Sequence, residues 1–572
     1  MFASVLINSN AKELNRVFDY VVPEEIKNSI NIGSRVFVPF GKGSRLSEGY
    51  VIGFKENSEY ECKEISKVED SILTNENIEL AKLMAQKYFC NVSDCIKLML
   101  PPGSSSKNLS KRVQEKQINI VYLNKENDEI EFEIQNNLKS EKQKKLLKFL
   151  IENKSIVASD LEAILEVSNA TLKALEKKEL VKIVKEKVDR NPFINKKIQR
   201  DYKLELNDEQ KSVYDQISFM IENDEYAEFL LKGVTGSGKT EVYLQLIQKT
   251  IELGKMAMVL VPEISLTPQI VDRFLARFGD CLAVLHSKLS NGERFDEWNK
   301  IKEERAKIVI GARSAIFAPC KHLGLIIIDE AHDNSYKSDM TPRYHAKDLA
   351  NYIAKQNNIP LVLGSATPDI CDYYKAQKRE MELALLTKRA NNAKLPNIEI
   401  VDMRKEIAMG NRSMFSSKLQ EKIAENLKKK KQTILFINRR GYSTFVMCRD
   451  CGYVMKCPNC NIALTYHSFE NKMKCHYCGH EQMIAKICPE CGSLKIKYFG
   501  SGTQKVEEQI AKLFPEATTI RMDIDTVSKK NSHETILNKF KNDNIDIMIG
   551  TQMIVKRTSF SKCNISWCYC SR

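Results

Sequence analysis

The sequence has no uninterrupted apolar run of the length that a membrane span needs, which is about 18 residues or more. Its start, Met1 to Asn10, lacks the basic-then-apolar pattern of a secretion signal. It also lacks internal repeats and long low-complexity tracts. These absences argue against a membrane or secreted protein, and we expect a cytoplasmic one.

The composition is that of an ordinary globular protein, with 43% hydrophobic and 28% charged residues. Its 572 residues exceed what a single core usually holds, so we expect several domains. The net charge of +14 favours a polyanionic partner such as nucleic acid, although a solvated surface on so long a chain would carry the same charge. In a reducing cytoplasm, 17 cysteines point to metal ligation rather than disulfides.

One segment carries the strongest functional signal and matches the pattern G-x-x-x-x-G-K-[ST] in full. It reads Gly233-Val234-Thr235-Gly236-Ser237-Gly238-Lys239-Thr240. An apolar run precedes it and a helical pattern follows it, as a nucleotide-binding loop requires. Backbone N–H groups would face the phosphates, Lys239 would reach the β- and γ-phosphates, and Thr240 would ligate Mg²⁺. The segment predicts an ATP site, and the alternative is a glycine-rich turn, which this context disfavours.

Two carboxylates follow a second apolar strand, at the ligand end expected for the same sheet. Leu325 to Ile328 leads into Asp329-Glu330-Ala331-His332, a DEAH box. Asp329 suits Mg²⁺, directly or through water, and Glu330 suits polarising the attacking water. Phosphoryl transfer needs mainly such positioning and charge compensation. The two segments together predict an ATP-hydrolysing motor, with a chance acidic strand end as the alternative.

Four further segments resemble superfamily 2 helicase motifs in their order and spacing. Gln210 resembles the glutamine that reads adenine. Val261 to Gln269 and Gly311 to Ser314, which includes Arg313, resemble segments that line a single-strand track. Gly364 to Pro368 resembles the segment that couples hydrolysis to lobe movement. These segments favour a helicase over other ATPases.

The rest of the chain is expected to contain modules of other kinds. Residues 1 to 105 alternate apolar runs with turn signals, which is typical of a small β-rich unit. Residues 141 to 190 have the layout of a winged helix, which would bind a DNA groove or serve only as a spacer. Residues 201 to 390 predict a parallel sheet covered by helices. A second α/β lobe follows, with strands expected at Ile398 to Val401 and Thr433 to Ile437.

Eight cysteines form four C-x-x-C pairs within 44 residues. One tight turn offers both sulfurs of a pair to a tetrahedral ion, so the eight cysteines predict two structural Cys₄ zinc sites. Nested pairing gives one ion to Cys448, Cys451, Cys488 and Cys491 and the other to Cys457, Cys460, Cys475 and Cys478. Sequential pairing is the alternative grouping, and redox pairs or an iron–sulfur cluster are the alternative chemistries.

The assembled motifs resemble those of the primosomal protein N′ (PriA) family of bacterial replication restart helicases. The resemblance rests on three segments: Gly233 to Tyr243, Pro262 to Thr267, and the cysteine-rich insert that follows Asn438 to Tyr442. The family usually reads DEEH where this chain has DEAH, and both carboxylates remain. The resemblance implies a multidomain α/β fold: two RecA-like lobes with a zinc-binding insert, preceded by the β-rich DNA-binding module and the winged helix.

The resemblance also implies an activity and partners. The expected activity is ATP-dependent 3′ to 5′ unwinding of DNA by a protein that recognises stalled forks and D-loops and initiates primosome assembly. Expected partners are forked DNA, single strands and 3′ ends, primosome proteins, single-stranded DNA-binding protein and the loader of the replicative helicase. A fork-binding scaffold with impaired ATPase is the alternative, and the zinc insert disfavours an RNA helicase or a restriction translocase.

Seven residues are candidates for DNA contact by this resemblance. Three lie in the N-terminal pocket segment: Phe18, Asp19 and Tyr20. Phe18 would stack on a base, and Asp19 would accept a hydrogen bond from a 3′-hydroxyl. Arg313 lies in the track segment Gly311 to Ser314, and three candidates lie with His345 in the loop after the DEAH box: Tyr336, Arg343 and Tyr344. The family's aromatic-rich segment senses single strands by stacking and cation–π contact, and a solvated loop is the alternative here.

These signals divide the chain into seven expected segments. They are a 3′-DNA-end-binding domain (1–105), a winged helix with linkers (106–200), helicase lobe 1 (201–394), the first part of lobe 2 (395–447), the zinc insert (448–498), the second part of lobe 2 (499–556) and a tail (557–572).

The tail departs from the family after Lys556. Gly550 to Lys556 resembles motif V, which should continue roughly as G-H-x-F-P-N-V-T-L, whereas this chain reads Arg557 to Arg572. One extra A in the codons around Lys556 would produce the observed residues, so we predict a single-base frameshift that the gene sequence would reveal. The motif VI arginine would then be missing. Because such an arginine finger is worth about 10³ to 10⁵ in rate, this chain would bind ATP and hydrolyse it poorly.

Overall fold

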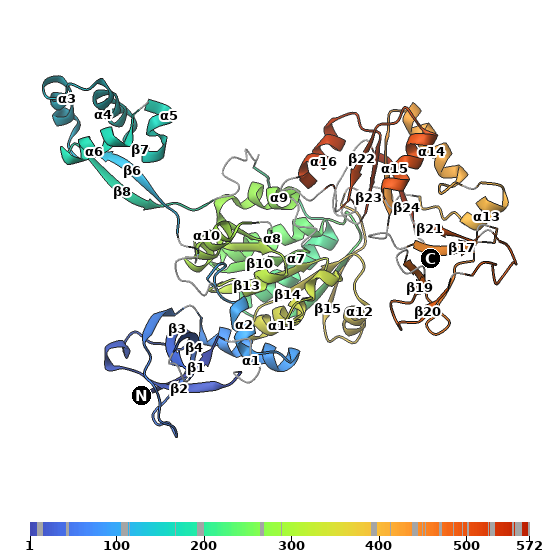
Figure 1. Cartoon of the computed structure of the whole chain (residues 1–572), viewed down its shortest axis with the longest axis horizontal. Helices are drawn as coiled ribbons and strands as arrows, with labels where there is room; N and C mark the ends of the chain where they lie inside the picture. Colours follow the sequence, from blue (N-terminus) through green and yellow to red (C-terminus); the bar gives the residue numbers. More distant parts are fainter. Residues whose placement is uncertain are drawn as a thin grey trace. The chain divides into compact units, whose positions relative to one another are not determined.

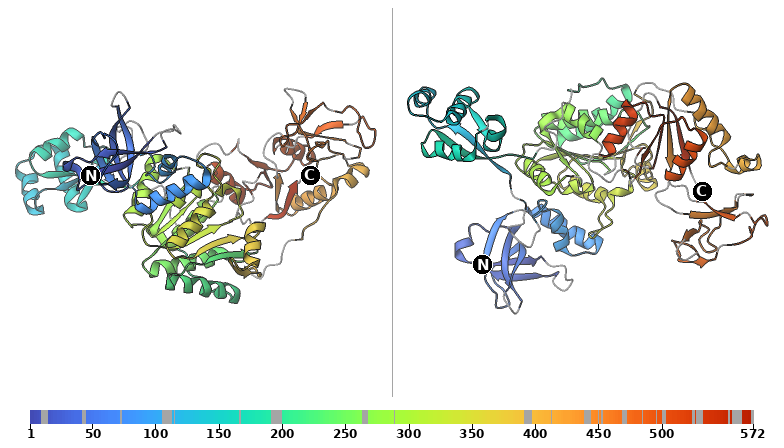
Figure 2. Two further views of the ribbon diagram at one scale, coloured as in Figure 1. Left: turned by 90° about the horizontal axis from the view of Figure 1, so that it is seen from below. Right: turned by 45° about the horizontal axis from the view of Figure 1, so that its top comes forward.

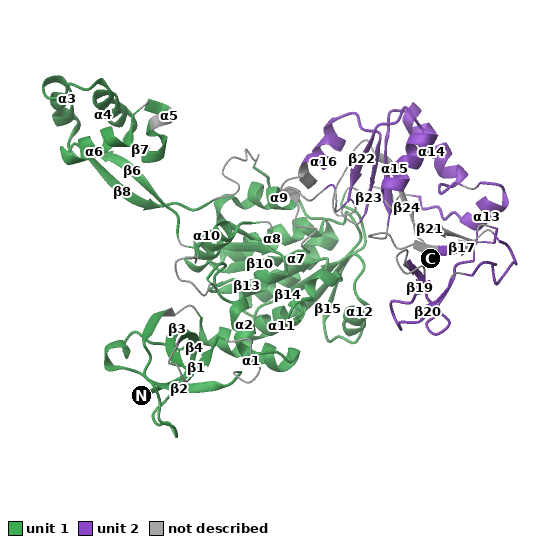
Figure 3. Ribbon diagram, viewed as in Figure 1, with its two compact units in different colours: residues 1–392 green, residues 393–572 purple. Residues whose placement is uncertain are grey.

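The computed structural model describes the chain except residues 9–14, 42–44, 72, 105–112, 114, 166, 191–199, 263–267, 288, 391–396, 412, 438–443, 449, 452, 468–471, 484, 495, 500–502, 524–525, 527–531, 552–553, 555–562 and 570–572. Figure 1 shows the order of its helices and strands. The chain divides into two units, residues 1–392 and 393–572 (Figure 3). Among the described residues, no helix is both long enough and apolar enough to cross a membrane.

The first module is an antiparallel sheet followed by two helices, which confirms the predicted β-rich unit. The sheet has the order β2-β1-β4-β3-β5, with β1 (Phe2–Ile7), β2 (Val17–Val21), β3 (Ser34–Phe40), β4 (Arg45–Lys55) and β5 (Lys67–Ser71). Helices α1 (Asn75–Tyr88) and α2 (Val92–Leu98) follow. Thr74 begins α1 by accepting a hydrogen bond from the Asn77 N–H, which satisfies one of the unpaired donors of the first turn.

The second module contains the helices expected for a winged helix, with a strand and a helix before them. In chain order it has β6 (Gln117–Leu123), α3 (Asn127–Asn136), α4 (Glu141–Asn153), β7 (Ser155–Val157), α5 (Leu161–Leu165), α6 (Asn169–Lys177) and β8 (Val181–Lys187). The strands pair in the order β7-β6-β8. β6 and α3 were not predicted, and the winged-helix assignment itself stays a prediction.

A seven-stranded parallel sheet forms the centre of the first unit, as predicted. Its order is β11-β12-β10-β13-β14-β9-β15, with β9 (Glu228–Gly233), β10 (Met256–Leu260), β11 (Leu282–Leu285), β12 (Ile308–Gly311), β13 (Leu323–Asp329), β14 (Leu361–Ser365) and β15 (Glu382–Leu386). The strands are short and rich in leucine, isoleucine and valine, and β10 to β14 are wholly buried, which is typical of a sheet covered on both faces.

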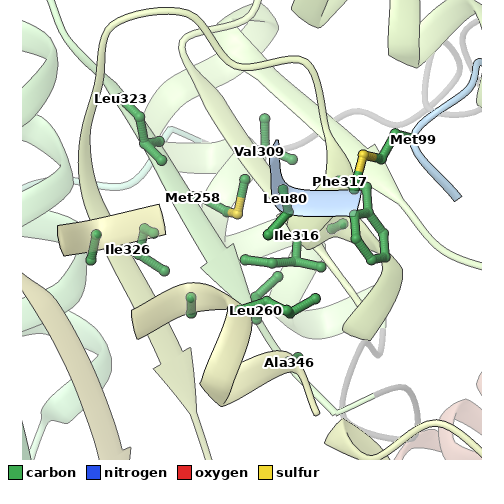
Figure 4. Close-up of a cluster of buried hydrophobic side chains, with 14 of the residues drawn as sticks. Leu80, Met99, Met258, Leu260, Val309, Ile316, Phe317, Leu323, Ile326 and Ala346 are labelled. Carbon is green, nitrogen blue, oxygen red and sulfur yellow. The ribbon is translucent and has the colours of Figure 1, made fainter. Parts of the chain in front are cut away.

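Helices cover both faces of this sheet (Figure 2). One face packs against α7 (Asp208–Asn223), α8 (Lys239–Glu252) and α9 (Pro268–Phe278). The other packs against α10 (Asn291–Lys302), α11 (Ala346–Gln356) and α12 (Ile370–Gln377). Leu80 of α1 and Met99, just after α2, join this second face beside Met258 and Phe317 (Figure 4). The N-terminal module and the large sheet therefore share one hydrophobic core.

The second unit has a smaller parallel sheet and a cysteine-rich insert. The sheet order is β22-β23-β16-β24, with β16 (Gln432–Ile437), β22 (Thr519–Met522), β23 (Ile547–Gly550) and β24 (Cys563–Tyr569). The helices are α13 (Met403–Ala408), α14 (Ser417–Lys428), α15 (Thr503–Leu513) and α16 (Ser532–Asn542). The insert sheet contains β17 (Thr444–Cys448), β18 (Thr465–His467), β19 (Lys472–Lys474), β20 (Glu481–Gln482) and β21 (Ile496–Phe499).

Two expectations for this unit have different outcomes. The strand expected at Thr433 to Ile437 is confirmed as β16. The strand expected at Ile398 to Val401 is wrong, because the segment pairs with no described strand and the side chains of Ile398 and Ile400 are almost fully exposed. Within the tail that departs from the family, β24 runs parallel to β16 at the edge of the sheet.

Candidate active site and metal centres

The glycine-rich loop connects the end of β9 to the start of α8 and is held closed by its own lysine. Lys239 is buried, and its Nζ donates to the Gly233 carbonyl over 2.7 Å. Gly238, just before α8, has a φ of +83°, a conformation that L side chains rarely adopt. The N–H groups of the first turn of α8 point toward the loop, which makes the site attractive to an anion. The loop therefore has the form of a phosphate cradle around the Lys239 ammonium.

Gln210 belongs to the same cradle although it lies before the first strand. It is buried in the first turn of α7, where Asn207 accepts its backbone N–H over 2.9 Å. Its Nε2 donates to the Ser237 carbonyl over 2.8 Å, and a Cβ added to Gly238 would meet this Nε2 at 2.3 Å. The predicted adenine-reading residue is thus attached to the back of the phosphate loop.

The DEAH box lies at the end of β13, which is separated in the sheet order from β9 and its phosphate loop by β14 alone. Asp329 is fully buried, and the Tyr243 hydroxyl donates to its Oδ1 over 3.3 Å. Glu330 adopts a φ of +47°, which is unusual for a residue with a side chain. The His332 Nδ1 lies 3.7 Å from Glu330 Oε2 and 2.8 Å from the Ser365 Oγ. Ser365 belongs to the segment expected to couple hydrolysis to movement, so both carboxylates have polar neighbours that can hold them.

A buried charge network joins α8 to α9 behind the phosphate loop. Arg277 Nη2 donates to both carboxylate oxygens of Glu241, over 3.1 and 3.2 Å. Gln245 donates to the same carboxylate over 3.0 Å, and the backbone N–H of Leu204 does so over 3.2 Å. Arg277 and Glu241 are each more than nine-tenths buried, and each has one further ionic partner: Asp201 lies 3.4 Å from Arg277, and Arg273 lies 3.6 Å from Glu241. Sequence reasoning missed both residues because they lie 36 positions apart.

The loop after the DEAH box packs into the protein instead of presenting its aromatic rings to solvent. Tyr336 is fully buried, and its hydroxyl lies 2.5 Å from the Asp329 carbonyl oxygen. Tyr344 is also buried, packs edge-on to Phe317 at 5.1 Å, and has its pKa raised by burial to about 12. In this conformation neither tyrosine can stack on a base, contrary to the stacking we expected. Their rings hold the loop instead.

The two arginines expected to contact DNA differ in exposure. Arg313 Nη1 donates to the Ser335 carbonyl over 3.0 Å and to the Lys337 carbonyl, while its guanidinium lies 5.8 Å from the centre of the Tyr344 ring. Arg343 is exposed. The structure therefore uses Arg313 to fasten the loop and leaves Arg343 available to a phosphate.

The predicted 3′-end pocket residues lie on both faces of β2. Phe18 and Tyr20 face the core, where Phe18 packs edge-on to Phe40 at 5.2 Å. Asp19 lies on the other face and accepts hydrogen bonds from Ser4 over 3.0 Å and from Lys55 over 2.9 Å. Burial raises the pKa of Asp19, but these hydrogen bonds outweigh it and the pKa lies below its usual value. The structure does not bring Phe18 and Asp19 to one face, because neighbouring strand residues point in opposite directions.

The eight insert cysteines form two tetrads, and the grouping is the nested one. One set is Cys448, Cys451, Cys488 and Cys491, and the other is Cys457, Cys460, Cys475 and Cys478. Within each set all Sγ atoms lie within 4.8 Å of one another. Cross-pair Sγ distances are 3.5 to 3.6 Å, close to the roughly 3.8 Å edge of a tetrahedron with zinc–sulfur bonds of about 2.3 Å. The donor set and its size fit zinc.

The turns around the cysteines explain why these sites can form locally. The residues after three of the second cysteines, Asn461, Gly479 and Gly492, all have positive φ. Each closes a turn by donating its N–H to the carbonyl of the first cysteine of its pair, as Gly479 does over 2.9 Å. The backbone N–H of His480 lowers the pKa of the Cys478 thiol to about 6, which favours the thiolate form that binds a metal.

Parts of the sequence-predicted sites fall outside the described residues. They are most of the Val261 to Gln269 track segment, the Asn438 to Tyr442 run, and the end of the motif V segment with the start of the tail.

Comparison with known proteins identifies three regions by family models. Residues 4–101 match the PriA 3′ DNA-binding domain (3′BD), residues 207–374 match the DEAD/DEAH box helicase model, and residues 457–482 match the Cys-rich region (CRR) domain of PriA DNA helicase. Similar curated proteins include the replication restart protein PriA of Bacillus subtilis, which is 42% identical over 98% of this chain and 77% of its own length. That of Chlamydia trachomatis is 36% identical over 99% of this chain and 76% of its own.

Proposed function

Since the chain belongs to the PriA family of replication restart proteins, we propose that it unwinds DNA in the 3′ to 5′ direction at stalled forks and D-loops and initiates primosome assembly there. It is an ATP-dependent DNA helicase of the DEAD/DEAH box type. The observation that supports the proposal most is the shared core, in which a PriA-type 3′ DNA-binding domain packs against the sheet that carries the phosphate loop.

Hydrolysis of ATP follows from the positions of four side chains, which we propose as catalytic. When ATP binds, the Lys239 ammonium would leave the Gly233 carbonyl and contact the β- and γ-phosphates instead. Thr240 and Asp329 would hold Mg²⁺, which would neutralise charge on the phosphates. Asp329 is already oriented for this by the Tyr243 hydroxyl. Glu330 would align the attacking water.

The rest of the ATP site orients these groups. His332 lies between Glu330 and Ser365, which is the last residue of β14. A movement of β14 would therefore be passed through His332 to the Glu330 carboxylate that aligns the water. Gln210 would read adenine with the amide that now contacts the Ser237 carbonyl. Zinc on the two cysteine tetrads would hold the insert together, since both sets are closed and leave no position for a substrate.

DNA contact is proposed for the exposed and charged parts of the first unit. Arg343 would bind a phosphate, and Asp19 with Lys55 would meet the 3′ end of a strand on the outer face of β2. Primosome proteins, single-stranded DNA-binding protein and the loader of the replicative helicase are the proposed protein partners. The proposed location is the bacterial cytoplasm.

DNA-stimulated ATP hydrolysis by the whole chain tests the proposal. The wild-type protein should hydrolyse ATP faster with forked DNA that has a free 3′-hydroxyl than with the same fork ending in a 3′-phosphate. Lys239→Ala should abolish hydrolysis, because it removes the ammonium that would bind the β- and γ-phosphates, and it should leave fork binding intact. Equal ATPase rates for the wild type and Lys239→Ala would leave only a fork-binding scaffold. Preference for duplex RNA would refute the DNA helicase.

A further inference from the structure

The last turn of α1 contacts the loop that follows the DEAH box, defined here as residues 334–345. The Tyr88 hydroxyl donates to Asp348 Oδ2 over 2.9 Å and accepts the backbone N–H of His345 over 3.2 Å. Asp348 lies in the first turn of α11, immediately after the loop. One tyrosine of the N-terminal domain thus binds both the end of the loop and the helix that follows it.

Two lysines strengthen this contact. Lys87 Nζ lies 2.9 Å from Asp348 Oδ2, and Lys337 Nζ lies 5.3 Å from the centre of the Tyr88 ring. Burial raises the pKa of Asp348, but the hydrogen bonds from Lys87 and Tyr88 outweigh it and the pKa lies below its usual value. A charged carboxylate and a cation over an aromatic ring both favour the observed placement of the loop.

The same loop reaches the ATP site through its other end. Lys337 and His345 pair as an antiparallel bridge, so the two ends of the loop hold each other. The next residue toward the DEAH box is Tyr336, whose hydroxyl lies 2.5 Å from the Asp329 carbonyl oxygen and 3.1 Å from that of Leu260. A single hydroxyl proton shared between these two carbonyls ties the loop to β13 and β10.

Helix α1 is a firm support for this path. Its side chains Ile78, Leu80, Ala81 and Met84 are buried in the core that it shares with the large sheet. The helix ends at Phe89, which has a φ of +51°, directly after Tyr88. A change in the N-terminal domain would therefore move Tyr88 together with the helix instead of being absorbed by a flexible end.

We infer that Tyr88 is a positioning residue that couples the N-terminal DNA-binding domain to ATP hydrolysis by holding the 334–345 loop against the DEAH box. The inference rests on the proposed function, because it requires an ATPase that responds to DNA. Tyr88 contacts neither nucleotide nor the reacting atoms. It acts through the loop and Tyr336 on the backbone of Asp329, whose carboxylate is a proposed Mg²⁺ ligand.

The variant Tyr88→Phe tests this coupling, and the chain offers a matched control. Tyr226 also places its hydroxyl against α11, where it accepts Asn351 Nδ2 over 3.0 Å, and Lys355 lies 5.4 Å from its ring centre. Tyr226→Phe therefore removes the same atom and keeps a lysine over the ring without touching the loop; it loses the hydrogen bond from Asn351, whereas Tyr88→Phe loses those to Asp348 and from His345.

Two measurements on the full chain distinguish positioning from a merely structural role. Amide hydrogen exchange of residues 334–345 without DNA should be faster in Tyr88→Phe than in the wild type and unchanged in Tyr226→Phe. Stimulation of ATP hydrolysis by forked DNA with a 3′-hydroxyl should fall about 2- to 30-fold in Tyr88→Phe, the range for a residue that couples two sites. The KM for ATP without DNA and the melting temperature should stay near their wild-type values.

The outcomes separate the inference from the proposed function. If the wild type responds to DNA and Tyr88→Phe responds equally, the coupling role is wrong while the helicase proposal stands. An equal loss of stimulation in Tyr226→Phe also overturns the inference, since any hydroxyl on α11 would then suffice. A wild-type ATPase that ignores DNA refutes both.

Discussion

Replacement of Gly364 by alanine should disrupt the ATP site, because β14 passes directly beside Tyr243. A Cβ built on Gly364 would lie 1.6 Å from the Tyr243 hydroxyl oxygen and 2.9 Å from Cζ of the same ring. Tyr243 lies on α8 and is itself buried, so its ring cannot simply swing into solvent. Extra volume in a packed core costs about 1–3 kcal/mol. The displaced hydroxyl would also lose its hydrogen bond to Asp329.

Tyr243→Phe should rescue part of this loss. It removes the hydroxyl oxygen that would lie 1.6 Å from the new Cβ of residue 364. The ring carbon Cζ, at 2.9 Å from this Cβ, would remain slightly closer than real Cβ contacts allow. The single variant Tyr243→Phe should cost about 0.5–1.5 kcal/mol, the value of one hydrogen bond. The double variant should therefore be more stable than the sum of the single effects predicts, by about 1 kcal/mol or more.

Urea unfolding of the four full-length proteins, followed by their ATPase rates, measures this cycle. Gly53→Ala is the control, because a Cβ at this strand glycine would meet nothing within 4 Å. The reasoning is refuted if the effects of Gly364→Ala and Tyr243→Phe add within about 0.5 kcal/mol, or if Gly364→Ala is as stable as the control. ATPase activity should stay low in the double variant, since the phenylalanine cannot orient Asp329.

Three further predictions concern the phosphate loop, a buried acid and the zinc insert. Gly238→Ala should weaken binding of a fluorescent ATP analogue about 10-fold or more, because the φ of +83° is strained and the Cβ would lie 2.3 Å from Gln210; unchanged affinity would contradict it. Burial raises the pKa of Glu297 above 4.5, so its contribution to stability is present below that pH and lost as the pH rises through the raised value. Glu297→Gln can still accept the Val284 N–H. Its free energy of unfolding in urea should exceed that of the wild type by more at pH 8 than at pH 5, and an equal difference at both pH values would be evidence against the idea. Cys478→Ser should lower the zinc content by mass spectrometry from about two ions per chain to about one, while retention of two would exclude this tetrad as a site.

The features that the sequence predicted well are encoded locally. The phosphate loop needs glycines at positive φ next to a helix start, and both requirements are visible within eight residues. The zinc tetrads are built from four C-x-x-C pairs, three of which close with the same short turn, so the spacing indicates tetrahedral sites. Continuous apolar runs such as β13 and β14 indicate a sheet that is buried on both faces.

Failures occurred where burial is decided by distant parts of the chain. Tyr336 and Tyr344 lie in a polar loop, and only contacts with Asp329 and Phe317 reveal that their rings are interior. Alternation at Ile398 to Val401 has the right period for a strand, but no described strand pairs with it. Period and polarity therefore identified the elements, whereas the partner of each side chain depended on tertiary structure.

The orientation of the water-aligning carboxylate illustrates how much of a site can lie outside its motif. Glu330 has a φ of +47°, a backbone conformation that costs about 1–3 kcal/mol in a residue with a side chain. Nothing in the letters DEAH requires it. The conformation is held from both sides, since the Ala331 N–H donates to the Gly364 carbonyl over 2.9 Å and the Asp333 N–H donates to the Glu330 carbonyl over 2.8 Å. Because one of these two restraints comes from β14, any shift of that strand would change the direction of the Glu330 side chain. The motif therefore supplies the carboxylate, and the neighbouring strand determines its orientation.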